Sequence, residues 1–338
     1  MILFPNHAKS ELVMHPAFSV IFLTTLIGTG QGLFLALITG QLYALGNLLP
    51  SQSESFYAVG SLISLLLLIA GLIASFFHLG RPERAWRAAA KWRTSWLSRE
   101  VLVLPLMMAL VAAYGLAHYF DFTQPLFQVA DILPVDATLL IGLLGTIAAF
   151  VLFVCTAMIY ASVKFLQEWH SPLTVANFTF LGIASGFMLA AAYSAWLGND
   201  LVVFFGTWAV IATLLGLLTR GISLARNRRL KHKSSLRTAI GVRHKAMAQK
   251  AQGATGGSFN TREFFHGKRS GTVLMVRNLF LVLVFPLPMV LIAIGYGMES
   301  PLLPLAAFLI QYLGLLAERW FFFAEAKHPQ NLYYQSIA

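Results

Sequence analysis

The residues best suited to chemistry lie in one segment between two long apolar stretches, which reads Phe76-Phe77-His78-Leu79-Gly80-Arg81-Pro82-Glu83-Arg84-Ala85-Trp86. Gly80 and Pro82 predict that the preceding helix ends beside His78. An imidazole, with an ordinary pKa of about 6.5, can hydrogen-bond a quinone carbonyl and transfer a proton. From residue type alone, a structural histidine at the membrane interface is the commoner explanation, because ionisable residues at the membrane edge are less often functional than those inside it. His78 is therefore a candidate quinone ligand, with a structural role as the alternative.

Two adjacent pairs of ionisable residues in or beside apolar stretches are further candidates. Arg99 and Glu100 begin the third stretch, where they either contact lipid headgroups or line the same polar pocket as His78. Glu318 and Arg319 lie in the last stretch, where each either borders a polar cavity or marks the helix end. Because positions i and i+1 do not share a helix face, Glu318 and Arg319 are expected to contact different neighbours.

Uncharged polar and small residues inside the stretches have a simpler expectation. Gln31, Gln41 and Asn177 are expected to form hydrogen bonds between helices, as amides in membrane helices commonly do. The glycine repeat at 28–32 is expected to let a second helix approach closely.

The elements that must hold these residues are transmembrane helices. Apolar types make up 58% of the 338 residues and charged types 11%, whereas soluble proteins carry roughly 25% charged residues. A helix needs about 20 mostly apolar residues to cross the hydrocarbon core, and these stretches lack the alternation of a membrane β-strand. Eight such stretches lie at about 17–46, 55–78, 101–120, 136–160, 173–196, 200–225, 273–296 and 301–324. The predicted fold is all-α: one polytopic membrane domain over residues 1–338, with its helices packed as bundles.

Charge predicts the orientation of these helices. Eight spans divide the loops into two sets, and all 24 Lys and Arg residues fall in the set that holds both termini. The other set carries Glu54, Asp121, Asp131, Asp136, Asp200 and Glu299. By the positive-inside rule, both termini and the basic loop at 226–272 are cytoplasmic, and the chain lies in the inner membrane. The net charge of +11 then reflects topology, because a nucleic-acid footprint needs its cations on a soluble fold.

Metal and haem centres are not expected in this chain. Its one cysteine, Cys155, cannot alone hold an iron–sulfur cluster or a Cys-rich zinc site. A bis-histidine haem needs two His at matched depth, whereas His78 and His170 fall near one face and His118 falls near the other, where an interfacial position is expected. No phosphate-binding, metal-binding or nucleophile motif is present.

Three strings in the chain carry a family resemblance. They are His78-Leu79-Gly80-Arg81-Pro82-Glu83-Arg84-Ala85-Trp86 with Leu97-Ser98-Arg99-Glu100 after it, the opening His15-Pro16-Ala17-Phe18-Ser19-Val20-Ile21-Phe22, and the closing Glu318-Arg319-Trp320-Phe321-Phe322-Phe323-Ala324-Glu325. Together they resemble the membrane-anchor subunits of dimethyl sulfoxide reductase-type molybdoenzymes, the DmsC-like family, over nearly the whole chain apart from the 226–272 loop. The resemblance implies an eight-helix anchor without haem that exchanges electrons with membrane quinone, either ubiquinone or menaquinone. It also implies two soluble partners, a four-cluster iron–sulfur subunit and a molybdopterin catalytic subunit.

The resemblance further implies which residues meet the quinone and the partners. In that family the histidine of the His-Leu-Gly motif is implicated in quinol binding, and His78 matches it. Arg81, Glu100 and Arg319 are weaker candidates for the same pocket. The cytoplasmic position of His78 implies that the iron–sulfur subunit docks on that face. The residues expected to dock it are Arg84, Trp86, Arg87 and Arg93.

A cytoplasmic partner is typical of the sulfite-oxidising, quinone-reducing branch of the family, which the closing string His328-Pro329-Gln330-Asn331-Leu332-Tyr333-Tyr334 also resembles. We therefore expect electrons to pass from sulfite through molybdenum and clusters to quinone. One alternative is a quinol-oxidising anchor of a dimethyl sulfoxide, tetrathionate or polysulfide reductase. Another is a secondary transporter, which would show repeated halves and paired broken helices. Pro286 and Pro288 are expected to distort one span only, which weighs against a transporter.

Overall fold

Helices of membrane-spanning length dominate the part of the chain that the structure describes. This computed structural model describes residues 18–77, 79, 81–129, 133–231, 235, 237–238, 241–242, 244 and 270–327. Its α-helices are α1 (Phe18–Leu45), α2 (Glu54–Phe76), α3 (Trp96–Tyr119), α4 (Ala137–Ala161), α5 (Pro172–Leu197), α6 (Val202–Arg228), α9 (Ser270–Val284), α10 (Pro286–Met298) and α11 (Leu302–Glu325). Eight spans are long and apolar enough to cross a membrane, and α9 with α10 forms one of them, Gly271–Met298. The predicted all-α polytopic fold is confirmed.

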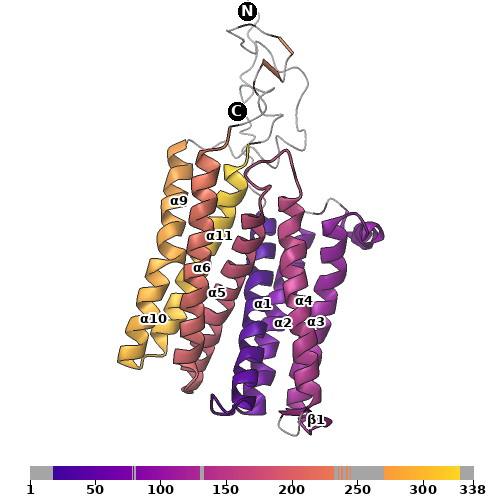
Figure 1. The fold of residues 1–338 in the computed structure, drawn as a ribbon, viewed down its shortest axis with the longest axis vertical. Coiled ribbons are helices and arrows are strands. Elements are labelled where there is room, and N and C mark those ends of the chain that lie inside the picture. The colour runs from indigo at the N-terminus through magenta and orange to yellow at the C-terminus, as the bar shows by residue number, and fades with distance from the viewer. Residues whose placement is uncertain are drawn as a thin grey trace, which may run out of the picture.

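The spans form two groups of four that meet along α1 and α5 (Figure 1). In the first group α1 packs against α2 and α4, and α3 packs against the same two helices. In the second group α5 packs against α6 and α11, and α11 packs against α9 and α10. The most apolar part of α1 is 78% buried, against 28% for α2. The buried axis of the molecule is therefore α1, while α2 faces outward along most of its length.

Glycines let α1 and α5 approach each other closely. A Cβ added to Gly28 would lie 3.6 Å from the Cα of Gly182. A Cβ added to Gly32 or Gly186 would collide with backbone atoms of the facing helix. The glycine repeat therefore packs α1 onto α5, as the sequence predicts.

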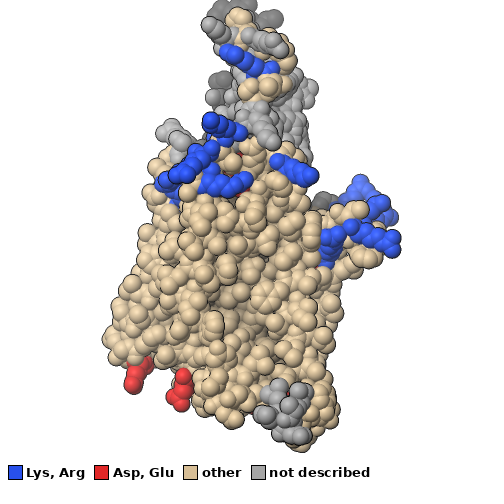
Figure 2. Space-filling view, viewed as in Figure 1, with Lys and Arg blue, Asp and Glu red and all other residues tan. Residues whose placement is uncertain are grey.

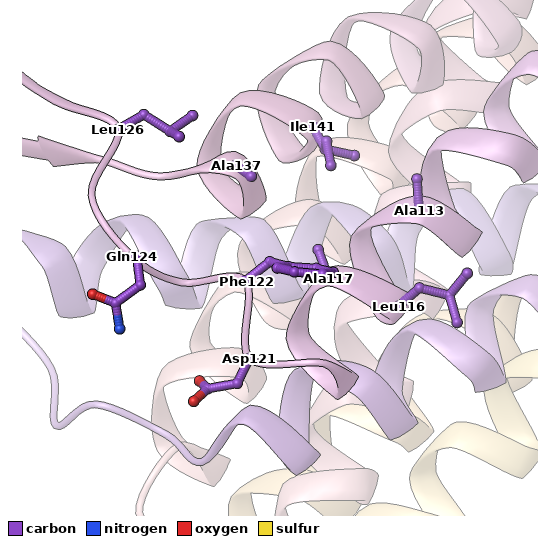
Figure 3. A pocket seen from close by; sticks show the side chains of 9 residues that line it. All are labelled: Ala113, Leu116, Ala117, Asp121, Phe122, Gln124, Leu126, Ala137 and Ile141. Atoms are coloured by element: carbon purple, nitrogen blue, oxygen red, sulfur yellow. The ribbon is translucent and has the colours of Figure 1, made fainter.

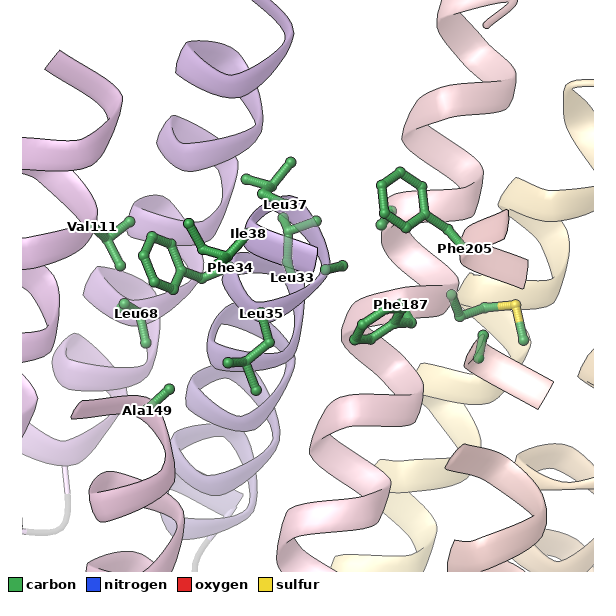
Figure 4. Close-up of a cluster of buried hydrophobic side chains, with 14 of the residues drawn as sticks. Leu33, Phe34, Leu35, Leu37, Ile38, Leu68, Val111, Ala149, Phe187 and Phe205 are labelled. Atoms are coloured by element: carbon green, nitrogen blue, oxygen red, sulfur yellow. The ribbon is translucent and has the colours of Figure 1, made fainter. Parts of the chain in front are cut away.

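Large apolar side chains fill the space on both sides of α1 (Figure 4). On one side Phe34 packs edge-on against Tyr114 of α3, with ring centroids 5.4 Å apart. On the other side Phe187 of α5 and Phe205 of α6 pack at 6.3 Å. These contacts hold both groups of helices against the same central helix.

The seventh span is broken near its middle. There α9 ends at Val284 and α10 begins at Pro286. Because Pro288 has no N–H, the Val284 carbonyl loses its helical donor. Gln311 of α11 replaces that donor, with its Nε2 3.2 Å from the carbonyl oxygen. The other described spans are continuous, as expected from the two prolines.

Charged side chains separate between the two ends of the bundle (Figure 2). The described Lys and Arg residues all lie toward the end where α1 begins and α11 ends, which we call the basic end. The described charges at the opposite, acidic end are Glu54, Asp121, Asp136, Asp200 and Glu299. This split agrees with the predicted pairing of loops, while the compartment that each end faces stays a prediction. The predicted basic loop lies mostly outside the described residues, although 226–228 still belong to α6 and 270–272 to α9.

Polar side chains cap helices at both ends. The N-caps that accept a backbone N–H are Ser53, Ser95, Asp136 and Ser171.

At the acidic end a short antiparallel hairpin, β1 (Phe127–Val129) with β2 (Leu133–Val135), precedes α4, a feature that the apolar pattern did not predict.

Candidate functional site

An apolar groove lies between α1 and α2 at the basic end. Its volume is about 340 Å³, and it is lined by Ser19, Phe22, Leu26, Ala70, Ile73, Ala74 and Phe77. Phe22, Ile73 and Phe77 are exposed on the surface of the bundle. His78 follows Phe77 directly but lies outside the described residues, so the position of its imidazole stays a prediction. The groove nevertheless forms a recess open to lipid at the helix end that carries the predicted quinone motif.

Beside this groove the chain forms an exposed 3₁₀ helix, η1 (Pro82–Lys91). The exposed cationic and aromatic side chains in and around it are Arg81, Arg84, Trp86, Arg87, Lys91, Trp92 and Arg93, beside one exposed acid, Glu83. The Arg87 guanidinium lies 5.5 Å from the centre of the Trp86 ring, and that ring is 72% exposed. The predicted docking residues thus share one basic and aromatic surface.

Arg99 fixes η1 to the start of α3. Its Nε donates to the Trp92 carbonyl and its Nη2 to the Arg93 carbonyl, each at 2.9 Å. Its guanidinium carbon lies 4.2 Å from the centre of the Trp96 ring. Arg99 thus has a structural role that the sequence did not predict, because it holds the two residues that follow η1. Whether it also contacts headgroups or lines the pocket stays a prediction.

Glu100 is buried one residue further along α3. Its side chain accepts a hydrogen bond from Thr156 of α4 at 2.5 Å, and the residue is 6% exposed. A carboxyl group in a membrane span is costly, so its presence indicates a function or a specific partner. The described lining of the groove comes from α1 and α2, and Glu100 does not belong to it. Its role in quinone binding stays a prediction.

Arg319 lies with Glu318 in a buried charge cluster of α6 and α11. Arg220 Nε is 2.9 Å from Glu318 Oε1, and Arg319 Nη1 is 3.4 Å from Glu318 Oε2. The Arg319 guanidinium carbon also lies 3.6 Å from the centre of the Phe178 ring in α5. Glu318 and Arg319 therefore contact each other as well as different neighbours, because the long arginine side chain reaches around the helix. The cluster is separate from the described lining of the α1–α2 groove.

Residues 14–324 match the family described as DMSO reductase anchor subunit (DmsC). The chain belongs to this family of membrane anchors. It is also 71% identical to a sulfite dehydrogenase subunit of Allochromatium vinosum over 325 residues, which cover 96% of this chain and 100% of that relative. The predicted family is confirmed, and the anchor subunit is a membrane component of an oxidoreductase complex.

The anchor subunit also has a buried polar cluster at its acidic end, which sequence patterns missed. His118 Nδ1 is hydrogen-bonded to Glu54 of α2, and its ring centre is 4.5 Å from that of Tyr114. Tyr114 donates to Gln41 of α1 at 2.9 Å, and Gln41 donates to Thr138 at 2.7 Å. His118 lies in the last turn of α3, in line with its expected interfacial depth, but it is 2% exposed and contacts neighbouring helices. The sequence signal that could have revealed this cluster is the presence of polar residues at the acidic ends of four spans.

The amide side chains in the anchor subunit divide into two kinds. Gln41 forms the predicted bonds between helices. The side-chain oxygens of Gln31 and Asn177 are buried without a hydrogen-bond partner in the described part of the chain. The prediction is therefore confirmed for Gln41 and finds no support at those two oxygens.

A second groove of the anchor subunit, of about 380 Å³, opens between α3 and α4 at the acidic end (Figure 3). Its polar lining residues are Asp121 and Gln124, and the rest of its wall is apolar. No predicted quinone motif adjoins it in the sequence, whereas the α1–α2 groove ends at Phe77, directly before His78, and is therefore the better quinone candidate.

Metal chemistry has no counterpart within the described ranges. No group of three His, Cys, Asp or Glu side chains there is placed to hold a metal ion, and Cys155 is buried. His15, His78 and His328 lie outside the described residues, so the expected lack of haem stays a prediction.

Proposed function

We propose that this anchor is the quinone-reactive subunit of a molybdenum and iron–sulfur oxidoreductase, and that it passes electrons from cytoplasmic sulfite oxidation to membrane quinone. The α1–α2 groove carries the quinone assignment, because it opens on the bundle surface and ends at Phe77, directly before His78. The 71% identity to a sulfite dehydrogenase subunit supports sulfite as the substrate of the complex.

Reduction of a quinone adds two electrons and two protons, and residues of this chain suit the binding and proton steps. Phe77 and its apolar neighbours suit the flat ring and the hydrocarbon tail. His78 would donate a hydrogen bond to a ring carbonyl and pass a proton to that oxygen. Arg81 would stabilise negative charge on the ring. Glu100 lies outside the described lining of the groove, so a second proton from it would have to reach the ring through water. We leave Arg319 outside this set, because its guanidinium faces Phe178 and Glu318.

We place the four-cluster iron–sulfur subunit on the basic end, with the molybdopterin catalytic subunit beyond it. Iron–sulfur clusters supply electrons at low potential, and they belong to that partner. Exposed Trp and Arg side chains of η1 are of the types enriched at protein interfaces. The positive-inside rule puts this end in the cytoplasm and the anchor in the inner membrane.

Filling the groove tests the quinone assignment. Ala70→Phe places a ring among the groove residues, so we expect the KM for quinone to rise about tenfold, equivalent to about 1.4 kcal/mol of lost binding. Dye-linked sulfite oxidation should not change, because it bypasses the anchor. Val59→Phe, at a 45% exposed position nearer the acidic end of α2, is the matched control. An unchanged KM in Ala70→Phe would place the quinone elsewhere and leave the assignment to the complex intact.

Reversing one charge on η1 tests the docking surface. Arg87→Glu should release the soluble subunits from washed membranes at salt concentrations that wild-type complex withstands, because opposed potentials weaken an interface. Arg228→Glu makes the same charge change at an exposed position, at the basic end of α6, and should retain them. Equal retention in the two variants, measured by immunoblot of the membranes, would remove η1 from the interface.

The opposite electron direction is the second candidate, and the family description as a DMSO reductase anchor favours it. In that case the anchor oxidises quinol for a dimethyl sulfoxide, tetrathionate or polysulfide reductase. A twin-arginine export signal on the neighbouring catalytic subunit would favour this direction and contradict the orientation proposed above. A secondary transporter is disfavoured, because one described span is broken and its counterparts are continuous.

A further inference from the structure

Polar residues of α6 face polar residues of α11, and together they form one ladder of paired side chains. Thr213, Arg220 and Asn227 recur every seven residues on α6, and Gln311, Glu318 and Glu325 do so on α11. The two helices run in the same direction through the membrane, so the residues meet as three rungs (Figure 1). At about 1.5 Å per residue, neighbouring rungs are separated by about 10 Å along the helix axis.

Each rung is a specific contact. At the innermost rung Gln311 donates to Thr213 at 3.0 Å. At the middle rung Arg220 and Glu318 lie 2.9 Å apart. At the outermost rung the Asn227 side chain lies close enough to the Glu325 carboxyl group to interact with it.

The ladder leads from solvent at the basic end to the middle of the membrane. The Glu325 side chain is 18% exposed, whereas those of Arg220 and Glu318 are 1% and 0% exposed. The innermost rung adjoins the break between α9 and α10, where Gln311 also bonds the Val284 carbonyl. Toward the acidic end the space is closed by buried apolar residues: Phe205, Ala209, Ile292 and Ala307.

Several polar atoms of the ladder, and one of the neighbouring Arg319, have no hydrogen-bond partner in the described structure. They are Arg220 Nε and Nη2, Glu318 Oε1 and Oε2, Gln311 Oε1 and Arg319 Nη1. Arg220 and Glu318 are within ion-pair distance, but without the alignment of a hydrogen bond. Buried polar groups are nearly always satisfied, and ordered water satisfies them where protein groups do not. Four of these atoms belong to the ion pairs of Glu318 with Arg220 and Arg319, and ordered water along the ladder would satisfy the hydrogen bonds that these pairs leave unmade.

We propose that this ladder is a proton pathway that opens at the basic end and stops at the membrane midplane. A proton from water binds a Glu325 carboxylate oxygen and then passes through ordered water to a Glu318 carboxylate oxygen, so that each O–H bond broken is matched by one formed. It returns to the water at the basic end by the reverse transfers. Arg220 lies between the two carboxylates, 2.9 Å from Glu318 and 3.9 Å from Glu325, so it can pair with either. When it turns to Glu325, Glu318 is free to accept the proton.

The charges facing Glu318 set the conditions for this exchange. Arg220 approaches it from α6 and Arg319 from its own helix. Glu325 adds a second carboxylate, with Glu168 from the α4–α5 loop near it. Tyr160 of α4 faces Arg319. Two arginines thus offset the two ladder carboxylates, and no net positive charge blocks the path.

The competing explanation is that the polar contacts only hold α6 and α11 together. A pH change applied to one side of the membrane at a time separates this explanation from a proton pathway. The whole complex is placed in sealed membrane vesicles of both orientations, and infrared difference spectra are recorded after a pH step outside, without substrate. We expect a protonated-carboxyl band that responds only in vesicles with the basic end outside. The band should disappear in Glu318→Gln and shift in frequency in Glu318→Asp.

Additional variants keep the proposal testable if a substitution impairs folding of the anchor. Glu318→Gln leaves Arg220 facing an uncharged partner, which can impair folding. Glu318→Asp keeps the negative charge, so a frequency shift in this variant is enough to assign the band to residue 318. Asn227→Leu changes no charge at the outermost rung and should slow the response at least fivefold. Thr219→Val is the control, because Thr219 bonds only carbonyls of its own helix. A band that is absent, responds from the acidic end, or keeps its rate in Asn227→Leu overturns the proposal. The measurement involves no turnover, so its outcome is independent of the proposed quinone function.

Discussion

Replacing His78 with Ala is expected to lower quinone-linked sulfite oxidation by about 100-fold or more, the usual contribution of a positioned acid or base. The complex should assemble and sulfite oxidation with an artificial dye should persist, because the catalytic site belongs to another subunit. The physical reason is the position of His78, one residue beyond the end of an apolar groove that opens to lipid. We expect an imidazole at this point of the chain to reach both a membrane-soluble ring and water.

A second variant separates proton transfer from binding. His78→Gln keeps a hydrogen-bond donor but cannot titrate, so we expect a KM for quinone near that of wild type with a low kcat. Equal losses in His78→Ala and His78→Gln would point to proton transfer as the main role. Full quinone turnover in His78→Ala would show that the pocket lies elsewhere and would withdraw the site proposed here.

Replacing Gly186 with Ala is expected to separate α1 from α5 and destabilise the whole chain. The added Cβ would collide with backbone atoms of Gly32 and Leu33, which cannot move without moving the helix. Overpacking of this kind typically costs about 1–3 kcal/mol, which corresponds to a fall of about 2–10 °C in apparent melting temperature. The hydrogen bond of 3.0 Å between Thr29 and Ser185, in the same contact, should weaken with it.

Gly221→Ala is the matched control for that variant. A Cβ at Gly221 meets nothing within 4 Å, so alanine there should leave the melting temperature unchanged or raise it slightly through helix propensity. The measurement is thermal unfolding of the purified complex, followed by loss of the monodisperse peak. If Gly186→Ala and the wild type have the same melting temperature, the close packing of α1 on α5 is wrong.

The sequence was sufficient for the spans and for the separation of charge. A membrane helix must satisfy its own backbone in lipid, so each span appears as a continuous apolar run whatever its neighbours are. The positive-inside rule also acts on each loop separately. For these reasons the eight spans, the single break at the prolines and the glycine contact on α1 were predictable. The family motif around His78 was readable for the same reason, because it is contiguous in the chain.

Only the tertiary structure decided which polar residues meet. Arg99 clamps η1 through two backbone carbonyls, and His118 is buried against Glu54, neither of which follows from local pattern. Glu318 finds Arg220 across a span that is remote in sequence. Inside a membrane, apolar side chains cannot distinguish one neighbouring helix from lipid, so close packing and polar contacts select the partners. Those contacts depend on helix rotation and depth, which the sequence of one span does not contain.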